Sequence, residues 1–104
     1  MIYPDKLVRD RIPELIRADG KECEVRILNE DEYRVQLNRK LEEELQRYLR
    51  SGDVTELTGM AEVLKALVST SNMTADEFQE LCRQKRERAG GFEKRLLLVS
   101  VSEP

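Results

Sequence analysis

The residues best suited to chemistry in this sequence are carboxylates, which gather in two segments. Glu42, Glu43 and Glu44 are consecutive, and Glu56 and Glu62 follow in the next segment. A helical wheel places Glu44 within roughly 40° of the centre of an apolar stripe. The stripe consists of Tyr33, Leu37, Leu41, Leu45 and Tyr48. A carboxylate facing a core is costly unless it is paired or binds a cation, so Glu44 either turns sideways or has a positive group beside it.

Carboxylates on two packed helices could share one cation. Glu44 is predicted on the buried side of one helix, and Glu56 at the flank of the apolar face of the next. Hard divalent cations such as Mg²⁺ favour oxygen ligands of this kind. The alternative is a solvated helix face on which Glu43 pairs with Arg47, four residues later.

Basic side chains near the start of the first predicted helix offer partners for an anion. Lys6, Arg9 and Arg11 could bind one together with free backbone N–H groups. The alternative is ordinary surface charge, with a salt bridge to Asp10.

The sequence offers no nucleophile of the usual kinds. It contains no His, and Cys23 and Cys82 lie in unrelated segments without a CxxC spacing. A catalytic triad or a Cys–His pair is therefore excluded, and any hydrolysis would have to rely on metal-activated water. The isolated cysteines indicate reduced, partly buried thiols in a cytosolic protein.

Composition predicts a single helical domain that covers residues 1–104. Charged residues make up 38% of the 104-residue sequence, and basic and acidic residues are interleaved with a net charge of -3. Nucleic-acid binding would need a clustered basic face, so it is not expected. The sequence contains no segment that resembles a signal peptide or a membrane span. We therefore expect a soluble, cytoplasmic protein without a membrane partner.

Three capping signatures position the helices that would carry these residues. The pairs are Asn29 with Glu32, Asp53 with Glu56, and Thr74 with Glu77. They predict a long helix over about residues 30–50 that ends near Ser51-Gly52, a second helix, and a third that stops at Ala89-Gly90-Gly91. The second helix has an apolar face of Leu57, Met60, Ala61, Leu64, Leu67 and Val68. A short connection predicts that the first two helices pack antiparallel.

A shorter helix and a small β ribbon are predicted at the ends of the chain. Asp10 can cap the short helix, with Pro13 in its first turn and Gly20 as its left-handed stop. Residues 23–27 alternate apolar and charged side chains, which indicates a half-buried strand. Residues 96–99 also indicate a strand, so the two segments predict a two-stranded ribbon. Pairing within one chain and pairing between chains both remain open.

Four blocks of the sequence together resemble a known family. They are residues 6–13 (Lys-Leu-Val-Arg-Asp-Arg-Ile-Pro), 39–44 (Arg-Lys-Leu-Glu-Glu-Glu), 56–64, and 88–95 (Arg-Ala-Gly-Gly-Phe-Glu-Lys-Arg). In this order they resemble the small phosphoribosyl-ATP pyrophosphohydrolase-like proteins of the MazG-like, all-α NTP pyrophosphatase superfamily. The resemblance implies a helical bundle that forms a homodimer or homotetramer through its long helices.

The resemblance also implies an activity and a metal site. Its members split a nucleoside triphosphate into the monophosphate and pyrophosphate, often as housecleaning of aberrant nucleotides. They hold Mg²⁺ with Glu-Glu-x-x-Glu on one helix and Glu-x-x-Asp on the next. Glu43 and Glu44 match the leading pair, as catalytic residues and metal ligands, and Glu56 matches the first ligand of the second motif.

Two positions depart from the pattern. The third Glu of the first motif falls on Arg47, and the Asp of the second falls on Gly59. Each change removes an oxygen ligand, and the first adds a positive charge, so we expect weakened Mg²⁺ affinity.

Three hypotheses follow from the sequence. The first is a metal-dependent nucleoside triphosphate pyrophosphohydrolase, with Lys6, Arg9 and Arg11 contacting the phosphates. The second is a non-catalytic relative in which Arg47 binds the anion directly, a task that suits a guanidinium. The third is a structural module that binds its own copies or a protein partner.

Overall fold

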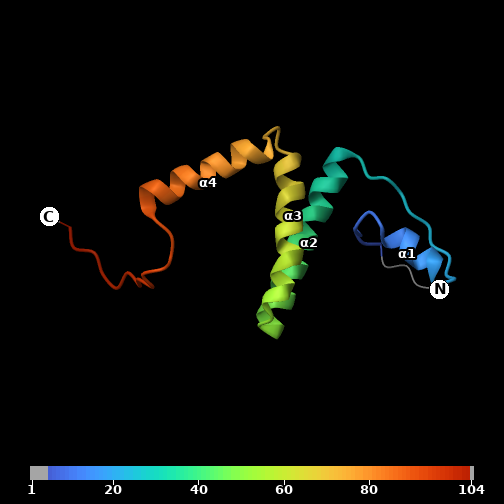
Figure 1. Cartoon of the computed structure of the whole chain (residues 1–104), viewed down its shortest axis with the longest axis horizontal. Helices are drawn as coiled ribbons and strands as arrows, with labels where there is room; N and C mark the ends of the chain where they lie inside the picture. The colour runs from blue at the N-terminus through green and yellow to red at the C-terminus, as the bar shows by residue number, and fades with distance from the viewer. Residues whose placement is uncertain (1–4, 104) are drawn as a thin grey trace.

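The protein is mainly α-helical, as the composition predicts. A computed structural model of the chain describes residues 5–103 (Figure 1). Its elements are α1 (Ile12–Ala18), α2 (Glu30–Ser51), the 3-10 turn η1 (Val54–Glu56), α3 (Leu57–Ser69) and α4 (Ala75–Ala89). This part of the chain contains no β-strand.

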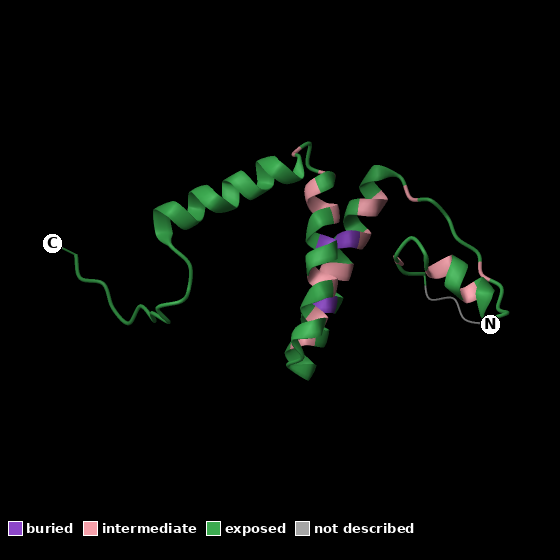
Figure 2. Cartoon of the chain, viewed as in Figure 1, coloured by how far each residue is buried: buried purple, intermediate pink, exposed green. Residues whose placement is uncertain are grey.

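Helices α2 and α3 form an antiparallel hairpin, which confirms the predicted pairing (Figure 1). Its buried apolar side chains, among the residues described, are Leu37 and Val63, which are 3% and 7% exposed (Figure 2). The predicted face of α3 was partly wrong, because it omitted Val63 and included Leu57, Ala61 and Leu64, which are exposed. The helix is turned so that Gly59 and Val63, four residues apart, share the inner face.

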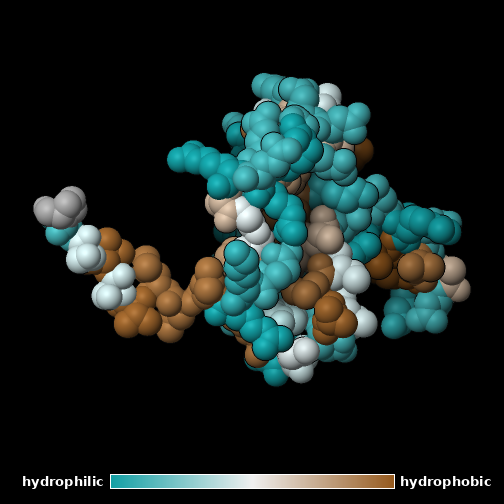
Figure 3. Space-filling view, turned by 60° about the vertical axis from the view of Figure 1, so that its left-hand side comes forward, coloured by the Kyte–Doolittle hydropathy of each residue, from teal (hydrophilic) through white to brown (hydrophobic). Residues whose placement is uncertain are grey.

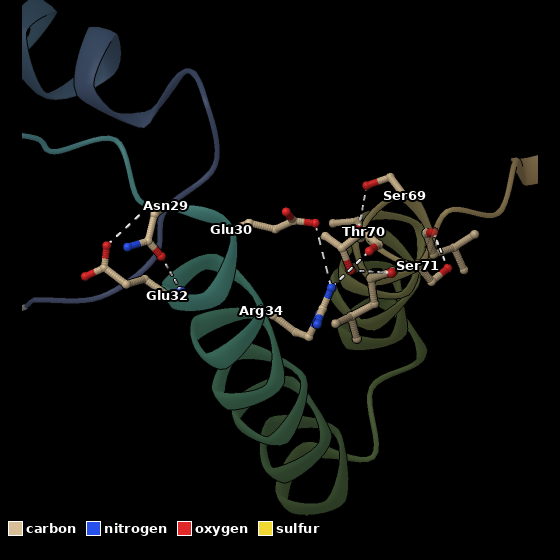
Figure 4. A network of polar contacts seen from close by, with 10 residues as sticks. Asn29, Glu30, Glu32, Arg34, Ser69, Thr70 and Ser71 are labelled. Carbon is tan, nitrogen blue, oxygen red and sulfur yellow. Dashed lines mark hydrogen bonds and ion pairs between the residues drawn. The ribbon is translucent and has the colours of Figure 1, made fainter.

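Local capping chemistry fixes the ends of α2 and α4. Asn29 accepts a hydrogen bond from the Glu32 N–H at 2.9 Å, and the Glu32 carboxylate accepts one from the Asn29 N–H at 3.2 Å (Figure 4). Thr74 and Glu77 form the same capping box at α4. At the other end of α2, Gly52 adopts φ 65°, the left-handed conformation that glycine enters without strain.

The predicted start of α3 is wrong in detail. The Asp53 side chain accepts a hydrogen bond from the Thr55 N–H at 2.9 Å instead of one from the Glu56 N–H. The Glu56 N–H donates to the Asp53 backbone carbonyl at 3.0 Å, which closes a 3-10 turn, so Glu56 ends η1 and α3 begins at Leu57. The capping box predicted for this pair therefore does not form.

The first helix also begins differently from the prediction. Arg11 occupies the N-cap position and makes no capping bond through its side chain, so Asp10 does not cap α1. Gly20 does end the helix at φ 80°, and the Lys21 N–H donates to the Ile16 carbonyl at 3.2 Å. Among the helices described, α1 packs against no other.

Arg34 joins the start of α2 to the end of α3. Its Nη2 donates to the Thr70 carbonyl at 3.0 Å and lies 3.9 Å from the Glu30 carboxylate (Figure 4). The last carbonyls of a helix lack intrahelical partners, and a guanidinium satisfies one here.

The predicted β ribbon does not form within the chain. Residues 23–27 lie near α1, whereas residues 96–99 lie beyond α4, toward the opposite end of the molecule (Figure 1). The structure extends over 67 × 33 × 22 Å. Two strands need adjacent backbones to exchange hydrogen bonds, and this arrangement keeps the segments apart.

We predict that acid weakens the start of α2 through Glu32. The Arg26 guanidinium donates two hydrogen bonds to the Glu32 carboxylate, and the Asn29 N–H donates another. These bonds lower the pKa of Glu32. A lowered folded-state pKa contributes stability above the unfolded value, about 4.3, and the contribution is lost as pH falls through the folded value. The gap in thermal midpoint between wild type and Glu32→Gln, followed by circular dichroism, should be present at pH 7 and close below pH ~4.

A suitable control is Glu22→Gln, which removes one exposed carboxylate outside α2. A wild-type to Glu32→Gln gap that stays constant from pH 7 to pH 3 would contradict the prediction.

Candidate functional site

An open pocket lies between the segment that precedes α1, helix α2 and the η1–α3 junction. Its volume is ≈ 380 Å³, within the range of about 300–1,000 Å³ typical of small-molecule sites. The described residues that line it are Lys6, Val8, Arg9, Ile12, Lys40, Glu44, Arg47, Thr55, Glu56, Thr58 and Gly59.

Glu44 is the buried carboxylate of this pocket. It is 6% exposed, which confirms the helical-wheel prediction that it faces inward. Its Oε1 lies 3.3 Å from Arg47 Nη1 and 3.8 Å from Lys40 Nζ. The positive groups that a buried carboxylate requires are therefore supplied by its own helix, one turn away on each side.

Gly59 leaves the space that the Glu44 carboxylate occupies. A Cβ atom at position 59 would overlap Oε2 of Glu44 and lie 2.7 Å from its Cδ. The Asp implied at this position by the family resemblance would therefore overlap with the carboxylate as it is placed here. A side chain at position 59 would therefore have to displace the Glu44 carboxylate from its present place.

The structure brings some of the predicted acidic residues together and separates others. Glu44 and the half-buried Glu56 line the same pocket, one from α2 and one from η1. Glu43 instead lies 3.8 Å from Lys40 and lines a second hollow, whose volume is ≈ 460 Å³. Its neighbours in that hollow are Arg39, Glu42, Gln46, Arg47 and Arg50.

The predicted basic residues divide in the same way. Lys6 and Arg9 line the pocket together with Arg47. Arg11 is not among the lining residues, and its Nε lies 3.3 Å from the carboxylate of Glu14 on α1. The sequence reasoning did not select Lys40, although its position four residues before the buried Glu44 is a signal that could have identified it.

The charge of the pocket favours an anion. Of the described lining residues, Lys6, Arg9, Lys40 and Arg47 are cationic, whereas Glu44 and Glu56 are anionic. Asp53 caps the adjacent turn, and its hydrogen bonds from Thr55 lower the pKa of its carboxyl, so it stays ionised in that role.

These residues do not fit Mg²⁺ as they stand. One potential ligand, Glu44, is paired with two cations, and Gly59 occupies the position where the family pattern has an Asp. Within residues 5–103, no group of three or more His, Cys, Asp or Glu side chains is placed to hold a metal ion. A Mg²⁺ site built from carboxylates would require Glu44 to exchange its present partners.

Comparison with known proteins identifies one relative of interest. A protein of Mycolicibacterium smegmatis, described as uncharacterized, is 51% identical over 51 residues. The match covers 49% of this chain and 51% of that protein, so it spans about half of the relative's length. No family model matches the chain, and no solved structure matches it. No helix in the described residues is both long and apolar enough to cross a membrane.

We predict that the effect of Gly59→Ala on the free energy of unfolding changes sign when Glu44 is replaced by Ala. In wild type the added Cβ would overlap the Glu44 carboxylate, so the substitution should lower the free energy of unfolding. In a Glu44→Ala background the space is empty, and the same substitution should stabilise by about 1 kcal/mol through helix propensity. Urea unfolding of the four proteins in the double-mutant cycle measures both effects.

A Glu44→Gln background is the matched control, because it removes the charge and keeps the bulk. There Gly59→Ala should remain destabilising. If Gly59→Ala stabilises the wild-type protein, the placement of the Glu44 carboxylate does not depend on the space beside Gly59.

Proposed function

We propose that the pocket binds the phosphate groups of a nucleoside triphosphate through direct contacts with its cationic side chains. The observation that carries the proposal is the convergence of Lys6, Arg9, Lys40 and Arg47 on one pocket. These residues come from two separate segments, and they outnumber the carboxylates beside them. A polyphosphate carries the opposite charge and accepts several charge-assisted hydrogen bonds.

Arg47 is the central contact of the proposed site. Its Nη1 donates to Glu44, which orients the guanidinium, and its side chain is 47% exposed. The remaining N–H groups of the planar fork can then face a phosphate oxygen. In this proposal Glu44 positions Arg47. The family resemblance instead gives Glu44 the role of a metal ligand.

The resemblance to the MazG-like superfamily supports a nucleoside triphosphate as the ligand. The blocks at residues 6–13 and 39–44, which carry much of the resemblance, contribute the basic side chains Lys6, Arg9 and Lys40 to the pocket. The chain would then be a MazG-like helical protein that holds the substrate class of its relatives. Which base and sugar it prefers would depend on contacts outside the phosphate site.

A second candidate is the Mg²⁺-dependent pyrophosphohydrolase that the resemblance implies. The observation in its favour is that Glu44 and Glu56, from two elements, line the same pocket. This enzyme would release a nucleoside monophosphate and pyrophosphate, with Glu43 and Glu44 as its predicted catalytic residues. It requires rearrangement of the pairs that Glu44 makes with Arg47 and Lys40.

Calorimetry in EDTA tests the first candidate. ATP, GTP, CTP, UTP and tripolyphosphate should bind without a divalent cation, because the contacts are direct. Lys6→Gln, Arg9→Gln and Arg47→Gln should each weaken binding about tenfold, the effect of losing one charge-assisted hydrogen bond.

Arg11→Gln is the matched control, since Arg11 pairs with Glu14 outside the pocket. Its affinity should equal that of wild type. Absence of binding in EDTA, or an equal loss in the control, would contradict direct phosphate binding at this pocket.

Pyrophosphate release from the same triphosphates tests the second candidate. If the pocket is catalytic with Mg²⁺, release should stop with EDTA and fall at least about 100-fold in Glu44→Gln, the scale of losing a group that stabilises the transition state. The double variant Arg47→Glu with Gly59→Asp restores the family pattern, and it should raise release above that of the parent. No release from either protein would argue against this candidate and leave the binding test standing, provided that circular dichroism shows the double variant to be folded, because Gly59→Asp places a side chain where the Glu44 carboxylate lies.

A further inference from the structure

The single chain exposes far more surface than a folded monomer of its size. Its accessible surface is 9895 Å² for a mass of 12.1 kDa, whereas folded monomers of that mass expose about 6,000 Å². Its radius of gyration is 18.8 Å, compared with about 13 Å for a compact domain of this length. The excess, about 3,900 Å², is several times the roughly 800 Å² per partner that a standard interface buries.

Much of the exposed apolar surface belongs to the segment after α4, which we call the C-terminal arm (residues 92–101). Phe92 is 97% exposed, and Leu96, Leu97, Leu98 and Val99 are 80% to 85% exposed. The arm extends away from the helices, and much of its outer part is hydrophobic (Figure 3). An extended apolar segment with unpaired backbone groups pairs readily with another chain.

A second extended segment, residues 23–27, also exposes apolar side chains. Val25 and Ile27 are 55% and 96% exposed and alternate with charged residues. Among the described residues, no backbone hydrogen bond joins this segment to another strand. In residues 23–27 the Cys23 carbonyl accepts a hydrogen bond from Arg17 at 3.4 Å, and the described backbone groups of this segment make no backbone–backbone hydrogen bond. The two segments lie toward opposite ends of the molecule (Figure 1).

We propose that the C-terminal arm of each copy pairs with residues 23–27 of a second copy, as an intermolecular β ribbon. Each chain has one arm and one acceptor segment, so a two-fold exchange uses both segments of each chain and closes at the dimer. The excess surface per chain is ample for such an interface. This pairing is separate from the proposed phosphate site and from association through the long helices.

Disulfide trapping between differently tagged copies tests the pairing. One copy keeps Cys23 alone (Cys82→Ser); the other has Cys23→Ser, Cys82→Ser and one new cysteine at position 96, 97, 98 or 99. Facing strand residues have Cβ atoms about 4.5–5.5 Å apart, within reach of a disulfide after small shifts. Mixed-tag dimers should form at alternate positions, either 96 and 98 or 97 and 99, because strand side chains alternate in direction.

No mixed-tag product at any of the four positions would overturn the proposal. A second test places Cys23 and the new cysteine in the same chain. A disulfide that forms within that chain and leaves the protein monomeric would also overturn the proposal. Sedimentation of the full chain gives an independent measure. Leu98→Asp should raise the dissociation constant of the homo-oligomer at least roughly tenfold, the effect of losing one buried leucine.

Leu49→Asp is the matched control on the outer face of α2, where Leu49 is 63% exposed. If Leu49→Asp separates the copies and Leu98→Asp does not, association runs through the helices and the arm proposal fails. It also fails if the wild-type chain sediments as a monomer at all concentrations, or if the arm pairs with a different protein.

Discussion

The structure depends on one buried carboxylate held between two helices. Glu44 points from α2 toward α3, where Gly59 leaves room for it, and Arg47 and Lys40 balance its charge from the same helix. An unpaired charge in this position would be costly, so the two cations are required wherever Glu44 stays inside. The same contacts bring helix α3 close to α2 and direct basic side chains into the pocket. The contacts of Glu44 therefore contribute both to the packing of the two helices and to the charge of the pocket.

That constraint changes how the acidic segment should be understood. A row of glutamates on a helix suggests a metal site when their number is considered alone. In three dimensions Glu43 and Glu44 face different hollows, and the pocket of Glu44 contains more cations than carboxylates. In the pattern of the family that the sequence resembles, one metal ligand falls on Arg47 and another on Gly59. The two positions are linked, because the guanidinium pairs with the carboxylate that occupies the space opened by the glycine.

Local signals in the sequence were sufficient for most of the helices. The capping boxes at Asn29 and Thr74 involve residues only three apart, so neighbouring chemistry decides them, and the inward direction of Glu44 follows from helical periodicity. The turn at Asp53 was missed because a side chain can bond the N–H two or three residues ahead, and the sequence does not choose between them. Val63 was missed because the angle of α3 depends on how Gly59 meets the neighbouring helix. The two segments predicted to form the ribbon do not pair within one chain, because the helices hold them toward opposite ends of the molecule, and local sequence signals do not specify such a long-range arrangement.

The separation of α1 from the helical hairpin has a consequence for how the pocket is assembled. Lys6 and Arg9 belong to a segment whose helix touches no other among those described, whereas Lys40 and Arg47 are fixed on α2. Lys6 and Arg9 are therefore joined to the hairpin through α1 and residues 19–29. An anion that contacted all four basic residues would have to order this segment, at a cost in conformational entropy. Affinity then depends on the stiffness of residues 19–29 as well as on the groups in contact. If the pocket binds a phosphate as proposed, residues 19–29 would influence the affinity without contacting the anion.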